Sequence, residues 1–165
     1  MALRNIRKYG DDILRKKCRE VEEIDKRTLV LIKDMFDTMY DADGVGLAGP
    51  QVGVLKRLFV IDIGEGPLVF VNPEILETSG KQIDEEGCLS LPGEMEEVMR
   101  PNYVRARALN EKGEEFEIEA EGLLARAILH EYDHLNGILF VDRINKKEPF
   151  KVPENSRPIV FKNEE

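Results

Sequence analysis

The sequence predicts an α+β fold, because the expected elements follow one another in the order helix, strands, helix. A helical apolar stripe runs through residues 26–40, short apolar runs separated by turn residues follow it, and a second helical stripe begins near residue 123. No repeat, low-complexity tract or dividing linker interrupts the chain, and 165 residues are enough to bury a substantial core. We therefore expect one domain that spans residues 1–165.

The first helix is expected over residues 26–40. Asp25 can cap its amino end, because an aspartate carboxylate accepts hydrogen bonds from the first free backbone N–H groups of a helix. The residues that would face the core recur at helical spacing, and they are Leu29, Ile32, Phe36 and Met39. The stripe is therefore interpreted as core rather than as a cofactor site.

The middle of the chain is expected to form strands. Apolar runs at residues 58–61 and 68–71 lie on either side of a turn at residues 64–67, and residues 75–83 are expected to be extended. Apolar and polar residues alternate over residues 104–108 and 116–120, across a turn at residues 110–113. This pattern predicts a hairpin that leads directly into the second helix. Residues 142–165, with three prolines, are expected to form a non-helical tail.

Composition limits the classes of function. The net charge of −9 argues against general affinity for nucleic acid or for anionic lipid, since both depend on an excess of Lys and Arg. The chain has no apolar run of 18 residues and no signal-peptide pattern at its amino end. We expect a cytoplasmic protein that binds neither a membrane nor a specific nucleic acid sequence.

The most informative stretch is His130-Glu131-Tyr132-Asp133-His134, which contains the only two histidines of the chain. On a helix, this spacing brings both imidazoles to one face, one turn apart, where they can bind a single metal ion. Glu131 would then flank the metal and could exchange protons with a bound water. Asn136-Gly137 follows as a helix stop of the left-handed type. The pattern predicts a hydrolytic metal site.

A catalytic metal site of this kind needs a third protein ligand, and two parts of the chain could supply it. A zincin-type peptidase would take a ligand further along the chain, but no histidine follows His134, and Glu148 and Glu154 each lie beside a proline. Upstream, Cys88 lies in a short glycine-bearing segment, Glu86-Gly87-Cys88-Leu89-Ser90. Two His and one Cys would leave a fourth metal position open for water. A structural metal module closed by Cys18 is the non-enzymatic alternative.

Three motifs together resemble the peptide deformylase family. They are the glycine-rich loop from Gly44 that ends at Gln51, the Glu-Gly-Cys-Leu-Ser segment, and the His-Glu-x-Asp-His helix motif, and the similarity runs over about residues 6–141. The resemblance implies antiparallel sheets packed around the metal-bearing helix. It implies removal of the N-formyl group from formyl-methionine at the start of nascent polypeptides, with transient ribosome contact as a further expectation.

The resemblance also implies the roles of particular residues. The metal ligands are Cys88, His130 and His134, and Glu131 is the general base and acid acting on a metal-bound water. The Gln51 amide and the Leu89 backbone N–H would stabilise the oxyanion of the intermediate. The cofactor is one divalent ion per chain, Fe²⁺ by resemblance, while the two-His, one-Cys donor set also suits Zn²⁺, Ni²⁺ or Co²⁺.

The methionine side chain is expected to enter an apolar pocket. Its expected lining comes from the glycine loop and from the helix, namely Gly44, Val45, Gly46, Leu123 and Ala127. Three positions depart from the family pattern. Gly49 replaces an alanine and is expected to loosen the loop, and Leu129 replaces a glutamine that could hydrogen-bond near the metal. Arg126 replaces an apolar residue, and it is expected to cap the pocket mouth and pair with Asp133 or with an acid from another segment.

Overall fold

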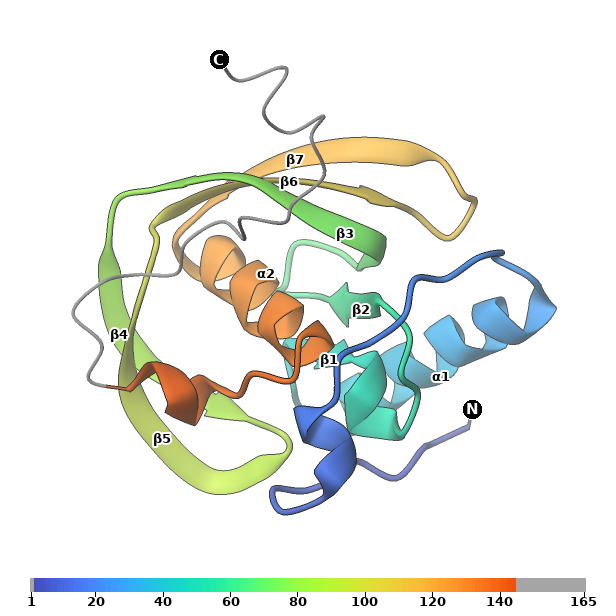
Figure 1. Cartoon of the computed structure of the whole chain (residues 1–165), viewed down its shortest axis with the longest axis horizontal. Coiled ribbons are helices and arrows are strands. Elements are labelled where there is room, and N and C mark those ends of the chain that lie inside the picture. The colour runs from blue at the N-terminus through green and yellow to red at the C-terminus, as the bar shows by residue number, and fades with distance from the viewer. Residues whose placement is uncertain (1, 145–165) are drawn as a thin grey trace.

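The computed structural model describes residues 2–144, and its elements confirm the α+β prediction (Figure 1). The helices are α1, Lys26–Asp41, and α2, Gly122–Leu135. The strands are β1 Gly46–Ala48, β2 Leu58–Ile61, β3 Leu68–Ser79, β4 Gln82–Cys88, β5 Leu91–Arg100, β6 Tyr103–Leu109 and β7 Glu115–Glu121. Short 3-10 helices occupy Asp12–Arg15, Gly49–Val52 and Phe140–Arg143. The last of these includes residues 142 and 143 of the tail that was expected to be non-helical, and residues 145–165 of that tail lie outside the described residues.

The strands form two antiparallel units on different sides of α2. Five of them make one sheet in the order β1-β2-β3-β6-β7, and β4 and β5 make a separate two-stranded hairpin. We call this hairpin, residues 82–100, the β4–β5 arm. Figure 1 shows α2 at the centre, with the large sheet curving over it on one side and the arm passing on the other. The helix is therefore enclosed by both units.

The strand predictions hold with one interruption. The runs at residues 58–61 and 68–71 belong to β2 and β3, and the predicted hairpin is formed by β6 and β7, with Val104 opposite Ala120. The extended segment expected over residues 75–83 is broken at Gly80, whose φ of +71° is a left-handed turn conformation that suits glycine. This turn directs the chain away from the large sheet and into the β4–β5 arm.

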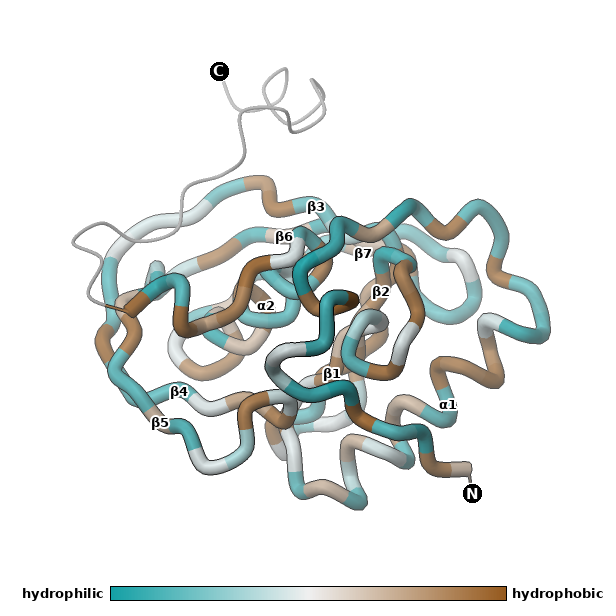
Figure 2. Tube along the Cα trace, turned by 60° about the horizontal axis from the view of Figure 1, so that its bottom comes forward, coloured by the Kyte–Doolittle hydropathy of each residue, from teal (hydrophilic) through white to brown (hydrophobic). Residues whose placement is uncertain are grey.

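Two apolar clusters hold these elements together. Ile128 and Leu129 of α2 are fully buried against the large sheet, where the rings of Phe59 and Phe70 stack 4.7 Å apart. Figure 2 shows hydrophobic residues along β1, β2 and α2 in the interior. A second cluster joins α1 to β1, β2 and β3. Since burying one such side chain contributes about 1.5–3 kcal/mol, the first cluster fixes the position of α2 and the second that of α1.

The amino end of α1 and the carboxyl end of α2 form as the sequence predicts. The Asp25 side chain accepts a hydrogen bond from the Thr28 backbone N–H at 2.9 Å, so it caps α1. At the carboxyl end of α2, Gly137 has a φ of +75°, and Arg57 donates hydrogen bonds to the Leu135 carbonyl and the Asn136 side chain at 3.1 Å each. The cationic Arg57 also complements the partial negative charge of that helix end.

Cys18 is a core residue. Its side chain is 6% exposed within the cluster between α2 and the large sheet, and its backbone N–H donates to the Leu135 carbonyl at 2.9 Å. Burial raises the pKa of this thiol to about 11.

Neither α1 nor α2, the α-helices of the described residues, is long and apolar enough to cross a bilayer.

Candidate metal centre and active site

Three side chains from two elements meet in the middle of the molecule. His130 and His134 project from α2 one turn apart, with ring centroids 5.0 Å apart, and Cys88 reaches them from the end of β4. The Cys88 Sγ lies 3.4 Å from His134 Nε2, and one ligand atom from each residue can be chosen so that all three lie within 4.8 Å of one another. Among residues 2–144 this is the group that could hold a metal ion, and Cys18 is not part of it.

His130 is oriented by a buried carboxylate. Its Nδ1 lies 2.8 Å from Glu86 Oε1, so a proton on Nδ1 would be donated to the carboxylate and the Nε2 lone pair would be left for a metal. Burial alone would raise the pKa of Glu86, but hydrogen bonds from Arg100 and His130 outweigh it and hold the pKa well below its usual range. Sequence reasoning missed this role, although Glu86 opens the Glu-Gly-Cys-Leu-Ser segment.

Arg100 joins the arm to the helix. It is 1% exposed, donates from Nε and Nη2 to the two oxygens of Glu86 at 2.9 and 2.8 Å, and donates from Nη1 to Asp133 at 2.8 Å. Asp133 also accepts two hydrogen bonds from Arg143, at 2.9 and 3.1 Å. A buried carboxylate is costly unless it is paired and hydrogen-bonded, so each of these acids depends on its arginines.

The structure corrects the expectation for Arg126. Its side chain does not reach up to the pocket mouth and does not pair with Asp133, since it is 4% exposed and forms an ion pair with Glu86 at 2.5 Å. Asp133 takes part in ion pairs with Arg100 and Arg143 instead. The alternative partner, an acid from another segment, is the one found. Leu129, the second departure, is fully buried in apolar surroundings.

Glu131 lies beside the proposed ligands. Its Oε2 is 4.0 Å from His130 Nε2, and burial raises the pKa of its carboxyl to about 7, although His130 acts in the opposite direction. Within residues 2–144, no group forms a hydrogen bond with the buried Glu131 Oε1 or with His134 Nδ1. Since buried polar atoms are nearly always paired, the unmet carboxylate oxygen is suited to a water or ligand in the site.

Gln51 is held with its amide nitrogen toward Cys88. The side chain is 1% exposed, and its Oε1 accepts a hydrogen bond from the Ala48 backbone N–H at 2.9 Å. This contact leaves Nε2 to donate toward Ser90 Oγ at 3.1 Å and Cys88 Sγ at 3.5 Å. Ser90 was not expected in the site from the sequence, although it closes the same five-residue segment as Cys88.

The structure corrects the expectation for Gly49 as well. A Cβ at this position would lie 2.7 Å from the Val54 carbonyl oxygen and 2.8 Å from the Lys56 carbonyl oxygen. The backbone at residues 54–56 therefore lies close to Gly49, in space that a side chain at position 49 would occupy. The Val54 N–H also donates a hydrogen bond to the Gly49 carbonyl at 3.0 Å. The glycine tightens the loop that carries Gln51 instead of loosening it.

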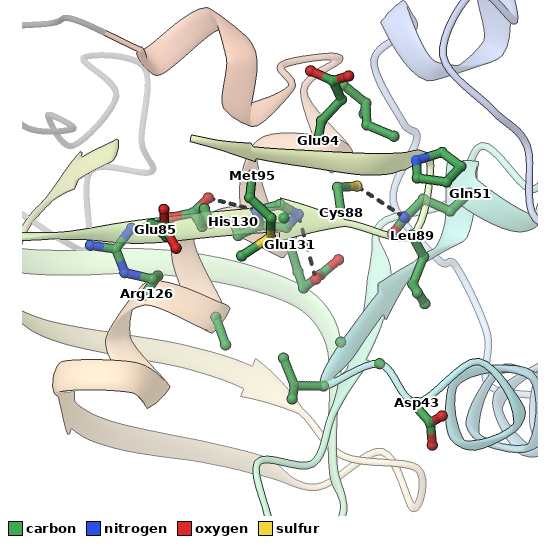
Figure 3. A pocket seen from close by; sticks show the side chains of 18 of the residues that line it. Asp43, Gln51, Glu85, Cys88, Leu89, Glu94, Met95, Arg126, His130 and Glu131 are labelled. Atoms are coloured by element: carbon green, nitrogen blue, oxygen red, sulfur yellow. Dashed lines mark hydrogen bonds and ion pairs between the residues drawn. The ribbon is translucent and has the colours of Figure 1, made fainter. Parts of the chain in front are cut away.

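These groups open into one cavity of about 450 Å³ (Figure 3). All five residues expected for the methionine pocket line it, and so do Gln51, Cys88, Leu89, His130 and Glu131. Leu123, which was expected to line the pocket, does so at its edge, where it is 53% exposed. Leu91 and Met95 add further apolar surface. The cavity therefore combines an apolar wall with a small set of polar groups, as ligand sites do.

The site fits a single divalent ion. Two imidazoles and a thiolate are donors for borderline metals, and three protein ligands would leave a coordination position for a water or substrate. Glu86 fixes the ring orientation of one histidine. The Glu131 carboxylate lies beside this group through Oε2, its Oε1 has no hydrogen-bond partner among the described residues, and it could accept a proton from a water in the cavity.

Comparisons with known proteins show the family of this chain. Residues 3–150 match the family model described as polypeptide deformylase. The peptide deformylase of Clostridium botulinum strain Alaska E43 is 82% identical over 147 residues, which cover 89% of this chain and 100% of that relative. Peptide deformylase 1 of Clostridium acetobutylicum is 71% identical over 148 residues, which cover 90% of this chain and 99% of the relative.

Solved structures are similar in fold as well. The crystal structure of peptide deformylase from Thermotoga maritima has a TM-score of 0.86 and 45% identity, covering 88% of this chain and 100% of that one. The enzyme of Synechococcus elongatus in complex with actinonin has a TM-score of 0.83 and 46% identity, covering 86% and 79%. The match to the family model and the identity to these relatives establish the assignment: the chain belongs to the polypeptide deformylase family.

Proposed function

We propose that this protein hydrolyses the N-formyl group from formyl-methionine at the amino end of nascent polypeptides, with one divalent metal ion held by Cys88, His130 and His134. The observation that carries the proposal is that these three side chains lie together and that two of them, Cys88 and His130, line one apolar cavity with Glu131 and Gln51. The names of the relatives and the family match over residues 3–150 support one catalytic domain for this reaction. Nascent polypeptides as substrates place the reaction in the cytoplasm, and transient ribosome contact remains a prediction.

Ferrous iron is the metal proposed for the cell, and Zn²⁺, Ni²⁺ or Co²⁺ would also suit the donor set. When bound, such an ion supplies a Lewis acid that polarises a carbonyl and lowers the pKa of a water from 15.7 towards about 7. The protein contributes the ligand geometry. Glu86 orients His130, and the core cluster between α2 and the large sheet holds the helix that carries both histidines.

Glu131 is proposed to move the proton. It takes a proton from the attacking water and passes one to the departing amine of methionine, because its carboxylate lies 4.0 Å from His130 Nε2 and keeps one oxygen without a hydrogen-bond partner among the described residues. General acid–base catalysis of this kind contributes about 10²–10⁴-fold. An amide in place of the carboxylate could not perform either transfer.

Gln51 and Leu89 are proposed to stabilise the oxyanion. The Ala48 N–H fixes the Gln51 amide so that Nε2 points toward Cys88, and Leu89, the next residue along the chain, also lines the cavity. Losing one such donor typically costs about 3 kcal/mol of transition-state stabilisation. The methionine side chain would lie against Val45, Leu123 and Ala127, where burial contributes about 0.8 kcal/mol per CH₂.

The test is activity and metal content of protein purified without oxygen. We expect one metal ion per chain and release of formate from formyl-Met-Ala-Ser, with no cleavage of an internally quenched peptide that lacks the formyl group. Cleavage of the internal peptide bond, with formyl-Met-Ala-Ser left intact, would instead support a peptidase. Full metal occupancy without activity on either substrate would support a structural metal module.

A further inference from the structure

Arg126 connects the two elements that carry the proposed metal ligands. It lies on α2 one turn before His130, and all three of its guanidinium nitrogens donate to the β4–β5 arm. Nη1 donates to Glu86 Oε2 at 2.5 Å, Nη2 to the Val98 carbonyl at 3.0 Å, and Nε to Gln82 Oε1 at 3.3 Å. A single side chain of the helix is therefore bonded to both strands of the arm.

Glu86 receives its hydrogen bonds from both sides of this junction. Oε1 accepts from Arg100 and lies 2.8 Å from His130 Nδ1, while Oε2 accepts from Arg100 and Arg126. Arg100 belongs to the arm, as Glu86 does, so these bonds fix the carboxylate within the arm. Arg126 belongs to the helix, and its bond fixes the carboxylate relative to His130.

The guanidinium does not use its donors in the cavity. Arg126 lines the cavity, but its nitrogens donate to Glu86, Gln82 and Val98 on the arm. Burying a guanidinium is costly unless its hydrogen bonds are satisfied, and here each nitrogen has an acceptor. This arrangement fits a fixed bridge between two elements better than a mobile cap at the cavity mouth.

We propose that Arg126 is a positioning residue for the metal centre, which clamps the β4–β5 arm to α2 and thereby sets Cys88 at the correct distance from His130 and His134. The inference rests on the proposed metal site. It assigns to Arg126 a contribution to metal affinity, through the oriented Glu86–His130 pair and through the position of β4. Groups that orient metal ligands in this way typically change affinity by about 10–100-fold when they are removed.

The direct experiment measures Zn²⁺ and Co²⁺ affinity by competition with a chelator, for the wild type and for Arg126→Met and Arg126→Lys. We expect Arg126→Met to bind each ion about 10–100-fold more weakly. Arg126→Lys should lie between the wild type and Arg126→Met, because an ammonium keeps the ion pair but cannot reach three acceptors in a planar fork. In the metal-free protein, hydrogen exchange of the β4 amides should be faster in Arg126→Met.

Arg107→Met is the matched control. Arg107 on β6 is 7% exposed and donates two hydrogen bonds to Glu74, at 2.8 and 3.2 Å. The Arg107→Met variant therefore also loses a nearly buried ion pair. It is not among the residues that line the cavity. We expect this variant to lose stability but to keep its metal affinity within about twofold of the wild type, well inside the 10–100-fold range expected of Arg126.

The outcomes separate the clamp from the metal site itself. Wild-type affinity in folded Arg126→Met would overturn the clamp, and so would equal weakening by Arg107→Met, because loss of stability would then explain both. If Arg126→Met does not fold, unchanged affinity in Arg126→Lys overturns the clamp and a graded loss supports it. A wild-type protein that binds neither ion would contradict the proposed metal site, and the clamp with it.

Discussion

Gly46 of β1 lies directly against the carboxylate of Glu131 on α2. A Cβ built at position 46 would be 2.5 Å from Glu131 Oε2 and 2.9 Å from its Cδ, which is closer than real Cβ contacts come. The missing side chain therefore leaves the space in which the carboxylate sits. Gly46 was expected from the sequence as a pocket residue, and the structure adds this contact with the proposed proton carrier.

Gly46→Ala should reduce kcat while metal content stays at the wild-type level. The added methyl group would push the Glu131 carboxylate away from its place beside His130, and misplacement of a catalytic group by about 1 Å can cost about 10²-fold. The measurement is kcat and KM on formyl-Met-Ala-Ser with fully metal-loaded protein. Gly44→Ala is the comparison, because its Cβ would meet the end of the partly buried Leu89 side chain, which can move more easily. Unchanged kcat in Gly46→Ala would show that the contact does not position Glu131.

Gly49→Ala should destabilise the protein. In a position without strain, Gly→Ala stabilises by about 0.4–1 kcal/mol through the unfolded chain. Here the methyl group would meet two backbone carbonyl oxygens, and overpacking of this kind costs about 1–3 kcal/mol. The sign of the change in the free energy of unfolding, from urea denaturation, decides between a tight loop and a loose one. A more stable Gly49→Ala protein would contradict the close approach described for this loop.

The two cysteines should react very differently with iodoacetamide. At pH 8, only about one in a thousand Cys18 thiols would be ionised, because burial raises its pKa to about 11, and the thiolate is the reactive form. Cys88 lines the cavity and is partly exposed. Peptide mapping of the metal-free native protein should show Cys88 labelled first and Cys18 labelled only after unfolding. Loading with Zn²⁺ should protect Cys88. Equal labelling rates in the native protein would contradict the burial of Cys18.

Charge at the cavity edge should influence the residues that follow formyl-methionine. Asp43, Glu85 and Glu94 line the cavity and are exposed, so the peptide would meet negative charge there. We expect formyl-Met-Ala-Lys to have a KM a few-fold lower than formyl-Met-Ala-Glu, with kcat little changed, since exposed charges contribute about 0.2–1 kcal/mol. The difference should shrink in 0.5 M salt. A KM difference that is absent at low salt, or unaffected by Glu94→Gln, would place the peptide away from this edge.

The fold could be predicted where the sequence carries local signals. Asp25 caps α1, Gly137 follows α2, and the alternating residues of β6 and β7 form the expected hairpin, because capping and side-chain alternation act over a few residues. The arm could not be predicted as a pair of strands. Most of its residues from Ile83 to Glu97 are polar or exposed, so no apolar alternation marks its register.

The candidate site was predictable in part for a related reason. The histidine pair follows from helical spacing, whereas the roles of Glu86 and Ser90 depend on contacts across 44 and 39 residues of chain. The burial of Arg126 depends on Glu86, 40 residues earlier, and an arginine on an otherwise apolar face gave no indication of that partner. The prediction for Gly49 was wrong because residue type alone does not show that two backbone segments of a loop lie close together.

The most direct test of the account is Glu131→Gln in metal-loaded protein. The amide keeps the size of the side chain but cannot take a proton from water or give one to the amine. We predict that metal content stays within about twofold of the wild type while the rate of formate release from formyl-Met-Ala-Ser falls by about 10²–10⁴-fold. Wild-type deformylation by a metal-replete Glu131→Gln protein would contradict the assignment of Glu131 as the proton carrier, and with it the proposed mechanism.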